Sequence, residues 1–130
     1  MTGKELIQAT YRHEKTERPP WVPYAGIHAA KFKGYTATEI LKDADKLVEC
    51  LMEVHRLYRP DGQPIAFDLQ LEAEILGCEL IWADDNPPSV TSHPLENTEE
   101  IPDKVVGPND GRIPVVMEAA RRMYKAVGDE

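Results

Sequence analysis

Short apolar runs alternate with helical segments along this chain, and the alternation restricts its fold more than any other feature of the sequence. Residues 21–25 and 64–67 have the length and composition of short strands, and helical segments follow both of them. Alternation of this kind is typical of parallel sheets whose faces are covered by helices. The sequence therefore predicts an α/β fold with two parallel strands.

The expected helices carry recognisable start signals and apolar faces. Thr2 with Glu5, and Thr36 with Glu39, have the spacing of capping boxes, in which a hydroxyl and a Glu side chain satisfy free amides of the first turn. Over residues 44–58 the apolar positions recur every three or four residues, as in an amphipathic helix. Pro114 suits the first turn of a final helix, which is expected over residues 115–126.

Between the second apolar run and the final helix, the pattern is typical of a hairpin. Residues 78–83 and 89–93 are expected to form two strands joined by a turn-forming Asp-Asp-Asn-Pro-Pro sequence. Residues 94–112 are expected to form the loop before the last helix, and residues 1–16 a leading helix. We interpret residues 1–130 as a single partial domain.

The chain has too few strands for a closed barrel. A β/α barrel takes about 250 residues, whereas this chain has 130 residues and supplies two parallel strands and a hairpin. Unpaired strand edges are templates for pairing with another copy. One interpretation is therefore a non-catalytic, self-associating module that forms a homodimer through these edges.

Composition and charge exclude several classes of partner. The formal net charge is −8, and no cluster of Lys and Arg offsets it, so binding to nucleic acid is not expected. A leader pattern and a run of about 18 apolar residues are both absent, which favours a cytoplasmic protein without membrane contact. Cys50 and Cys78 lack the spacing of a metal motif, so no metal site is predicted in this chain.

Polar residues near the ends of the two expected strands are the candidates for a site. Asp68 directly follows the second strand, where it either lines a pocket or caps the helix expected over residues 69–76. Tyr24 and His28 lie at the end of the first strand and just beyond it, where they either contact a ligand or belong to the packing and the surface. We take Asp68 as the catalytic candidate and Tyr24, His28 and Glu72 as candidate substrate contacts.

Short motifs around both expected strands carry a family resemblance. They are, in chain order, Arg18-Pro19-Pro20-Trp21-Val22-Pro23, Ala25-Gly26, Phe67-Asp68, Glu72-Ala73-Glu74 and Leu76-Gly77. Together they resemble the N-terminal third of the uroporphyrinogen decarboxylase family, which also contains zinc-dependent methylcobamide:coenzyme M methyltransferases. The resemblance implies the N-terminal part of a TIM (β/α)8 barrel, incomplete because the chain stops before the third barrel strand.

The resemblance also implies roles for particular residues. Asp68 matches the aspartate with which the decarboxylases bind the pyrrole NH groups of a tetrapyrrole. The arginines with which that branch holds substrate carboxylates have no counterpart, because residues 24–28 contain no arginine. The implied parent is therefore a methyltransferase, and a tetrapyrrole decarboxylase is the alternative.

In the methyltransferase branch, a zinc-activated thiol attacks a methyl-corrinoid. The resemblance implies that the full-length parent binds zinc and a corrinoid and acts on a small-molecule, tetrapyrrole or corrinoid substrate. The zinc ligands of that branch, a His and two Cys, lie in the C-terminal half of the barrel. We therefore expect this chain to hold no cofactor of its own and to be inactive alone.

Overall fold

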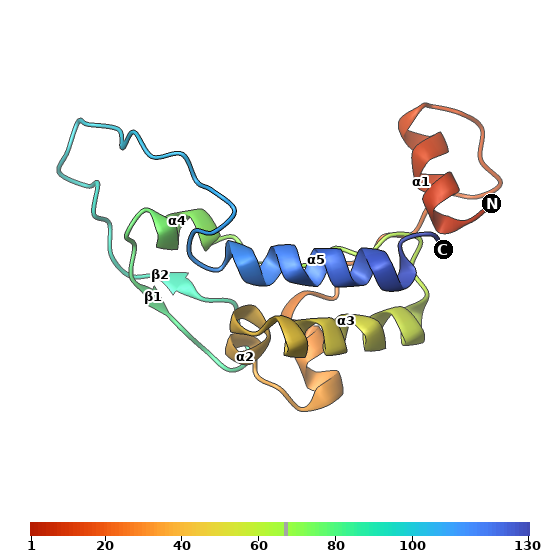
Figure 1. Cartoon of the computed structure of the whole chain (residues 1–130), viewed down its shortest axis with the longest axis horizontal. Helices are drawn as coiled ribbons and strands as arrows, with labels where there is room; N and C mark the ends of the chain where they lie inside the picture. Colours follow the sequence, from red (N-terminus) through yellow and green to blue (C-terminus); the bar gives the residue numbers. More distant parts are fainter. Residues whose placement is uncertain (67) are drawn as a thin grey trace.

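The computed structural model describes residues 1–66 and 68–130, and it is rich in helices (Figure 1). The elements are α1 (Gly3–Tyr11), the 3-10 helix η1 (Gly26–Lys33), α2 (Ala37–Lys42), α3 (Ala44–Tyr58), α4 (Leu71–Ile75), β1 (Leu80–Ile81), β2 (Ser89–Val90) and α5 (Ile113–Val127). Both predicted capping boxes are confirmed, since Thr2 and Thr36 accept hydrogen bonds from the amides of Glu5 and Glu39. The amphipathic helix predicted over residues 44–58 is confirmed as α3.

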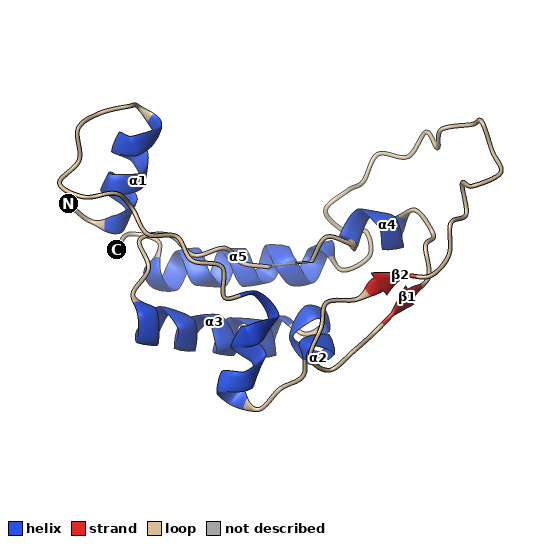
Figure 2. Ribbon diagram, turned by 180° about the vertical axis from the view of Figure 1, so that it is seen from behind, coloured by secondary structure: helices blue, strands red, loops and turns tan. Residues whose placement is uncertain are grey.

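Helices α3 and α5 lie side by side and run in the same direction (Figures 1 and 2). Two ion pairs agree with this direction, because the residue that comes later in α3 pairs with the residue that comes later in or after α5. Arg122 of α5 meets Asp45 in the first turn of α3 at 2.5 Å, and Glu130, beyond α5, meets His55 near the end of α3 at 3.0 Å. Parallel neighbouring helices are what successive β/α units produce, because each unit returns the chain to the same end of the sheet.

The hydrophobic core lies where η1, α2, α3 and α5 meet, and α3 supplies the largest share of it. The buried core residues are Ala29, Ala30, Ile40, Leu41, Leu47, Val48, Cys50, Leu51, Val54, Ala119 and Met123. Ala119 is fully buried, and its small side chain lets α5 approach α3 closely. Burial also raises the pKa of the Cys50 thiol to about 11, so this cysteine is an unreactive packed residue.

The predicted hairpin is confirmed, but the prediction of two parallel strands is wrong for the described residues. β1 pairs with β2 in antiparallel register, with Leu80 opposite Val90 and Ile81 opposite Ser89. Residues 21–25 and 64–66 form no strand, and Phe67 lies outside the described residues. Among the described residues, no backbone hydrogen bond joins these two segments; Trp21 O instead accepts from the amide of Asp61, in the turn after α3, at 2.9 Å.

The missing ladder has a physical reason. Parallel strands are stable inside sheets that continue on both sides, and the described residues provide no further parallel strand beside these two segments. Pro23 and Pro64 also lack the N–H group that a ladder needs. The described structure is therefore helical with one small antiparallel sheet, although its two long helices keep the order of β/α units.

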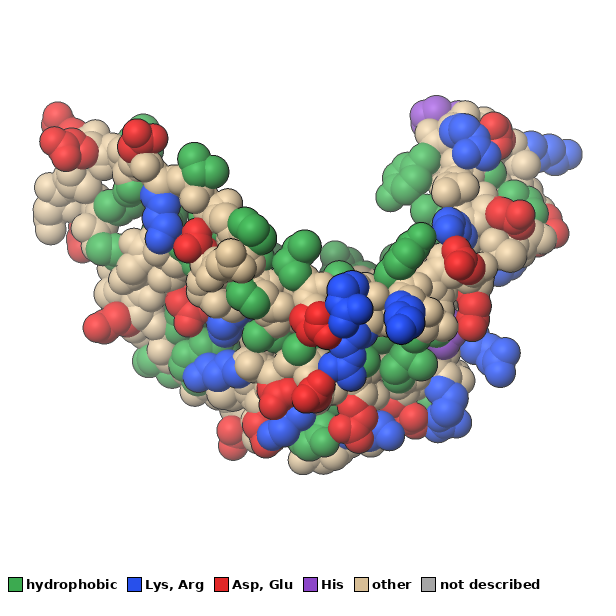
Figure 3. All heavy atoms as spheres, viewed as in Figure 1, with side chains coloured by type: hydrophobic (Ala, Val, Ile, Leu, Met, Phe, Trp, Pro, Cys, Tyr) green, Lys and Arg blue, Asp and Glu red, His purple; other side chains and the backbone are tan. Residues whose placement is uncertain are grey.

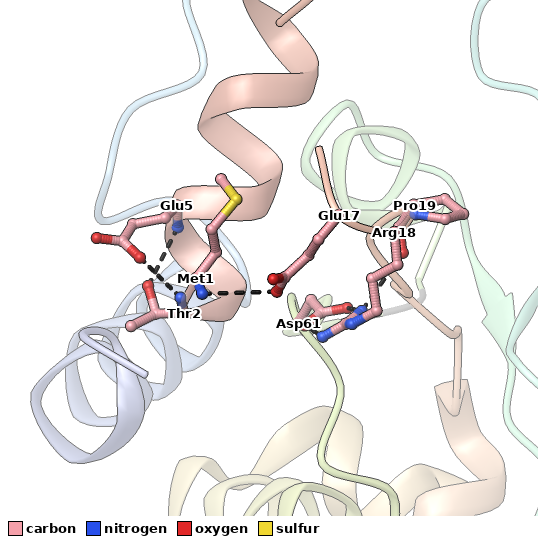
Figure 4. Close-up of polar contacts among 7 residues, drawn as sticks. All are labelled: Met1, Thr2, Glu5, Glu17, Arg18, Pro19 and Asp61. Atoms are coloured by element: carbon pink, nitrogen blue, oxygen red, sulfur yellow. Dashed lines mark hydrogen bonds and ion pairs between the residues drawn. The ribbon is translucent and has the colours of Figure 1, made fainter. Parts of the chain in front are cut away.

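A carboxylate anchors the segment before η1 to the turn after α3 (Figure 4). Asp61 has a side chain that is 7% exposed, and it accepts hydrogen bonds from both Nη atoms of Arg18 at 2.6 and 2.7 Å. The backbone amide of Trp21 donates a third bond at 2.7 Å. The Arg18 bonds and then the Trp21 amide lower the pKa of the Asp61 carboxyl from 3.8 to about 2.

This anchor predicts a loss of stability in acid. A carboxyl whose pKa is lower in the folded chain stabilises the fold above its unfolded pKa, and this stabilisation is lost as the pH falls through the folded value. Because the two values for Asp61 are 3.8 and about 2, we expect the urea midpoint to fall across that interval. Urea unfolding followed by circular dichroism should show a smaller fall for Asp61→Asn. If the urea midpoint of Asp61→Asn depends on pH as it does in the wild-type chain, other carboxylates cause the acid sensitivity.

The surface is hollowed between two projecting arms (Figure 3), one formed by α1 and the other by the loop between β2 and α5. Hydrophobic side chains are visible along the hollow. Large apolar residues that are more than half exposed include Tyr24, Leu69, Met117 and Tyr124. Among the described helices, none has both the length and the apolar character needed to cross a membrane.

Candidate functional site

Asp68, the predicted catalytic residue, lies in a buried ion pair. Its side chain is 1% exposed, and its Oδ2 accepts a hydrogen bond from Nη1 of Arg112 at 2.5 Å. Its Oδ1 accepts a bond from the backbone amide of Gln70 at 2.9 Å. This bond closes a local turn ahead of α4 and is not the predicted helix cap, because Gln70 itself occupies the N-cap position. Both carboxylate oxygens are therefore held by donors of this chain.

Arg112 is the residue that connects the segments around Asp68. It stands at the N-cap position of α5, and its side chain is 11% exposed. Its Nε donates to Glu74 of α4 at 2.7 Å, and its Nη1 also donates to the carbonyl of Leu41 in α2 at 3.2 Å. A planar guanidinium has five donors in a fixed fork, so it can serve several acceptors together. The buried Nη2 finds no partner within the described residues.

Trp82 and Lys42 complete this group. The Cζ of Arg112 lies 4.7 Å from the centroid of the Trp82 ring, and Nζ of Lys42 lies 4.0 Å from the same centroid. Cations at these distances are attracted by the negative face of an indole ring. The two cations formally balance the carboxylates of Asp68 and Glu74. We call Lys42, Asp68, Glu74, Trp82 and Arg112 the Arg112 cluster.

Gly111 allows α4 to lie against the start of α5. Its φ is +49°, a conformation that glycine adopts without steric cost. A Cβ atom at this position would lie 2.7 Å from Cγ1 of Ile75 in α4, closer than packed atoms tolerate. The absence of a side chain at Gly111 thus brings Glu74 within reach of the residue that follows, Arg112.

Gly111→Ala is expected to lower the free energy of unfolding by about 1–3 kcal/mol, because strain at positive φ and the contact with Ile75 act together. Urea unfolding measures the loss. Gly34→Ala is the matched control, because Gly34 has a φ of +71° but no atom within 4 Å of an added Cβ. Equal losses in the two variants would show that the contact with Ile75 contributes nothing.

Tyr24 and His28 line a shallow pocket outside the Arg112 cluster. The pocket is bounded by Trp21, Pro23, Tyr24, Ala25, His28 and Tyr58. The His28 ring packs edge-on against Phe32, with 5.1 Å between the ring centroids. Tyr24, which is 67% exposed, also borders a small cavity together with Ala66, close in the chain to Asp68.

Glu72 is exposed on α4 and lies outside the Arg112 cluster, whereas Glu74 belongs to it. Residues two apart on a helix face different directions, so a sequence pattern alone does not show which of the two points inward. The sequence patterns did not point to Arg112, whose partners lie far from it in the chain. A cation at a helix N-terminus is repelled by the helix dipole, so a buried Arg at this position needs carboxylates close by.

The described residues contain no group of three His, Cys, Asp or Glu side chains placed to hold a metal ion. They therefore do not fit the zinc site that the family resemblance implies. Zinc in a longer parent protein would need ligands from outside the described part of this chain.

Comparison with known proteins gives consistent matches along nearly the whole chain. The family model for uroporphyrinogen decarboxylase (URO-D) matches residues 2–130. The methylcobamide:CoM methyltransferase MtbA of Methanosarcina acetivorans is 27% identical over 135 residues, covering 99% of this chain and 40% of the relative. A methylated-thiol–coenzyme M methyltransferase of Methanosarcina mazei is 44% identical over 61 residues, covering 45% of this chain and 16% of the relative.

A solved structure agrees with these matches. A methyltransferase from Methanosarcina mazei superposes with a TM-score of 0.80 at 25% identity, covering 98% of this chain and 40% of that protein. This chain thus spans 40% of the length of the solved methyltransferase and of the Methanosarcina acetivorans relative. With the family model matched over residues 2–130, the chain belongs to the uroporphyrinogen decarboxylase family.

Proposed function

We propose that this chain is the N-terminal portion of a corrinoid-dependent methyltransferase with a TIM-barrel fold, and that the Arg112 cluster lies beside its reaction site. The observation that carries the proposal is the likeness, over 98% of this chain and with a TM-score of 0.80, to a methyltransferase of greater length. The relatives named as methylcobamide:CoM and methylated-thiol–coenzyme M methyltransferases indicate a methyl-corrinoid or methylated thiol as donor and a thiol as acceptor.

The segment from the first apolar run through η1 favours methyl transfer over tetrapyrrole decarboxylation. A tetrapyrrole with many carboxylates needs cationic clamps, best supplied by the fork of an arginine. The 3-10 helix η1 begins with Gly26, Ile27 and His28, and its two cations are Lys31 and Lys33. Lys33 is already 3.8 Å from Glu53. This unit is therefore poorly suited to hold a polyanionic tetrapyrrole.

Asp68 is the carboxylate that this chain contributes to the proposed reaction site. It follows the second apolar run, and barrels place their reacting groups at the carboxyl ends of such segments. A buried carboxylate held by two donors has a fixed direction, and a group fixed in this way can orient the reactants that lie beside it. When bound, the corrinoid supplies the methyl group, and the residues of this chain orient the reactants and exclude water.

A hybrid protein tests the proposal. The full chain is joined to the part of the Methanosarcina acetivorans relative that it does not cover, and methyl transfer from methylcobalamin to coenzyme M is measured. We expect transfer by the hybrid and none by the chain alone. Asp68→Asn should lower kcat of the hybrid about 100-fold, because an amide nitrogen cannot accept one of the two hydrogen bonds that fix the group.

Asp45→Asn is the control for this experiment. Asp45 also pairs with an arginine, Arg122, but its side chain is 87% exposed, so its loss should leave kcat within about twofold. A hybrid that folds, by circular dichroism and thermal unfolding, and transfers no methyl group would contradict the proposal. Decarboxylation of uroporphyrinogen by the hybrid would instead favour the other branch of the family.

A self-associating module is the second candidate, and the surface of the first apolar run favours it. Trp21 and Val22 are 50% and 44% exposed, and among the described residues no backbone hydrogen bond joins this run to residues 64–66. Exposed segments of this kind are templates for pairing with another copy. Size-exclusion chromatography with light scattering should then give a dimer, and a monomer at high concentration would argue against it.

A further inference from the structure

Two donors hold the carboxylate of Asp68. One holds it within its own turn, and the other holds it relative to a distant part of the fold. The amide of Gln70 lies two residues away and belongs to the same local turn. Arg112 lies 44 positions away in the sequence and enters from the start of α5. Arg112 is thus the donor that fixes the direction of Asp68 relative to the rest of the fold.

The guanidinium of Arg112 is itself held from several sides. Glu74 accepts from Nε at 2.7 Å, the carbonyl of Leu41 accepts from Nη1 at 3.2 Å, and the ring of Trp82 lies 4.7 Å from Cζ. These contacts come from α4, from α2 and from the segment that follows β1. A planar group held in this way has little freedom to rotate, so the bond that it donates to Asp68 has a defined direction.

We propose that Arg112 is the positioning residue of the reaction site, which orients the Asp68 carboxylate without touching the reactants. This inference rests on the proposed function, because the direction of Asp68 affects a rate only when Asp68 faces the reactants. Lysine does not replace Arg112 in this role. Its single ammonium can neutralise Asp68 but cannot hold Asp68, Glu74 and Leu41 with one rigid fork.

Kinetics of the hybrid protein test the positioning role. Arg112→Lys should lower kcat about 10- to 100-fold and leave KM for methylcobalamin and coenzyme M nearly unchanged, because a misdirected group slows the reaction more than it weakens binding. The kcat of Arg112→Ala should fall at least as far. Added methylguanidinium, which supplies the same planar cation, should raise the kcat of this variant about tenfold. Arg121→Lys is the control, since Arg121 lies on the same helix and makes an exposed pair with Glu118.

Two outcomes would overturn the positioning role in an active hybrid. In the first, Arg112→Lys retains kcat within about twofold, so that the direction set by the fork has no effect on the rate. In the second, methylguanidinium restores the thermal stability of Arg112→Ala but not its kcat, which assigns Arg112 a purely structural role. A folded wild-type hybrid without methyl transfer overturns the proposed function, and the dependent positioning role with it.

The chain alone provides a measurement that does not depend on activity. If Arg112 holds Asp68, the double variant Asp68→Ala with Arg112→Ala should have a urea midpoint at or above that of the less stable single variant, because no unpaired Asp68 carboxylate is left. Shifts that simply add would show that the two side chains act independently, and the proposal would fail at its first step. This result also separates a failure of the Arg112–Asp68 contact from a failure of the proposed methyl transfer.

Discussion

Replacing Arg112 with glutamine is expected to lower the free energy of unfolding by about 3–5 kcal/mol, because the change leaves a buried carboxylate without its charged partner. Asp68 is 1% exposed and Arg112 is 11% exposed, so water does not compensate the lost bond. The same change removes the bonds to Glu74 and to the carbonyl of Leu41. Urea unfolding monitored by circular dichroism measures the loss.

Arg121→Gln is the matched control, because it removes the same chemical group from the exposed side of the same helix. Arg121 and Glu118 are 65% and 42% exposed. An exposed pair on one helix contributes about 0.3–0.5 kcal/mol. Similar losses for Arg112→Gln and Arg121→Gln would contradict the burial of charge at the Arg112 cluster.

Replacing Ile40 with alanine is expected to lower the free energy of unfolding by about 2–5 kcal/mol, because the deleted atoms leave a cavity in the core. Ile40 is 1% exposed and lies in α2. It borders a small cavity that Leu47 and Leu51 of α3 also line, and the truncation would enlarge this cavity. Chemical unfolding of the variant and the wild-type chain gives the difference.

Leu69→Ala controls for the general effect of shortening an aliphatic side chain. Leu69 is 77% exposed, so its truncation should change stability by less than about 0.5 kcal/mol. This residue also neighbours Asp68, so the control shows whether the turn before α4 tolerates a substitution. A large loss of stability in Leu69→Ala together with a small loss in Ile40→Ala would contradict the burial of Ile40 in the core.

The helices could be predicted because their signals lie within a few residues of each other. The Thr2 and Thr36 capping boxes act over three residues, and both were predicted and are present. The spacing of apolar residues in α3 likewise repeats with every turn. The hairpin followed from two apolar runs around a turn-forming sequence, and β1 pairs with β2 as expected.

The parallel strands could not be predicted from local signals, because a strand forms only when a neighbouring strand offers hydrogen-bond partners. Residues 21–25 have suitable composition, but a ladder needs a partner edge, and in the described residues they form no strand. The order of α3 and α5 still reflects two β/α units. The local pattern thus predicted the helices and the hairpin better than it predicted the hydrogen bonding of residues 21–25.

The sequence by itself determined the helix starts, the hairpin and the choice of Asp68 as a candidate, because each of these depends on residues that are close together in the chain. The leading helix, expected over residues 1–16, ends at Tyr11. The family followed from short motifs along residues 18–77. Only the tertiary structure decided what surrounds Asp68. Arg112 lies 44 positions from it, and Glu74 and Trp82 reach the same guanidinium from two further segments. Contacts between distant segments leave no periodicity in a single sequence, so the burial and the pairing of Asp68 emerged only when the helices were packed together.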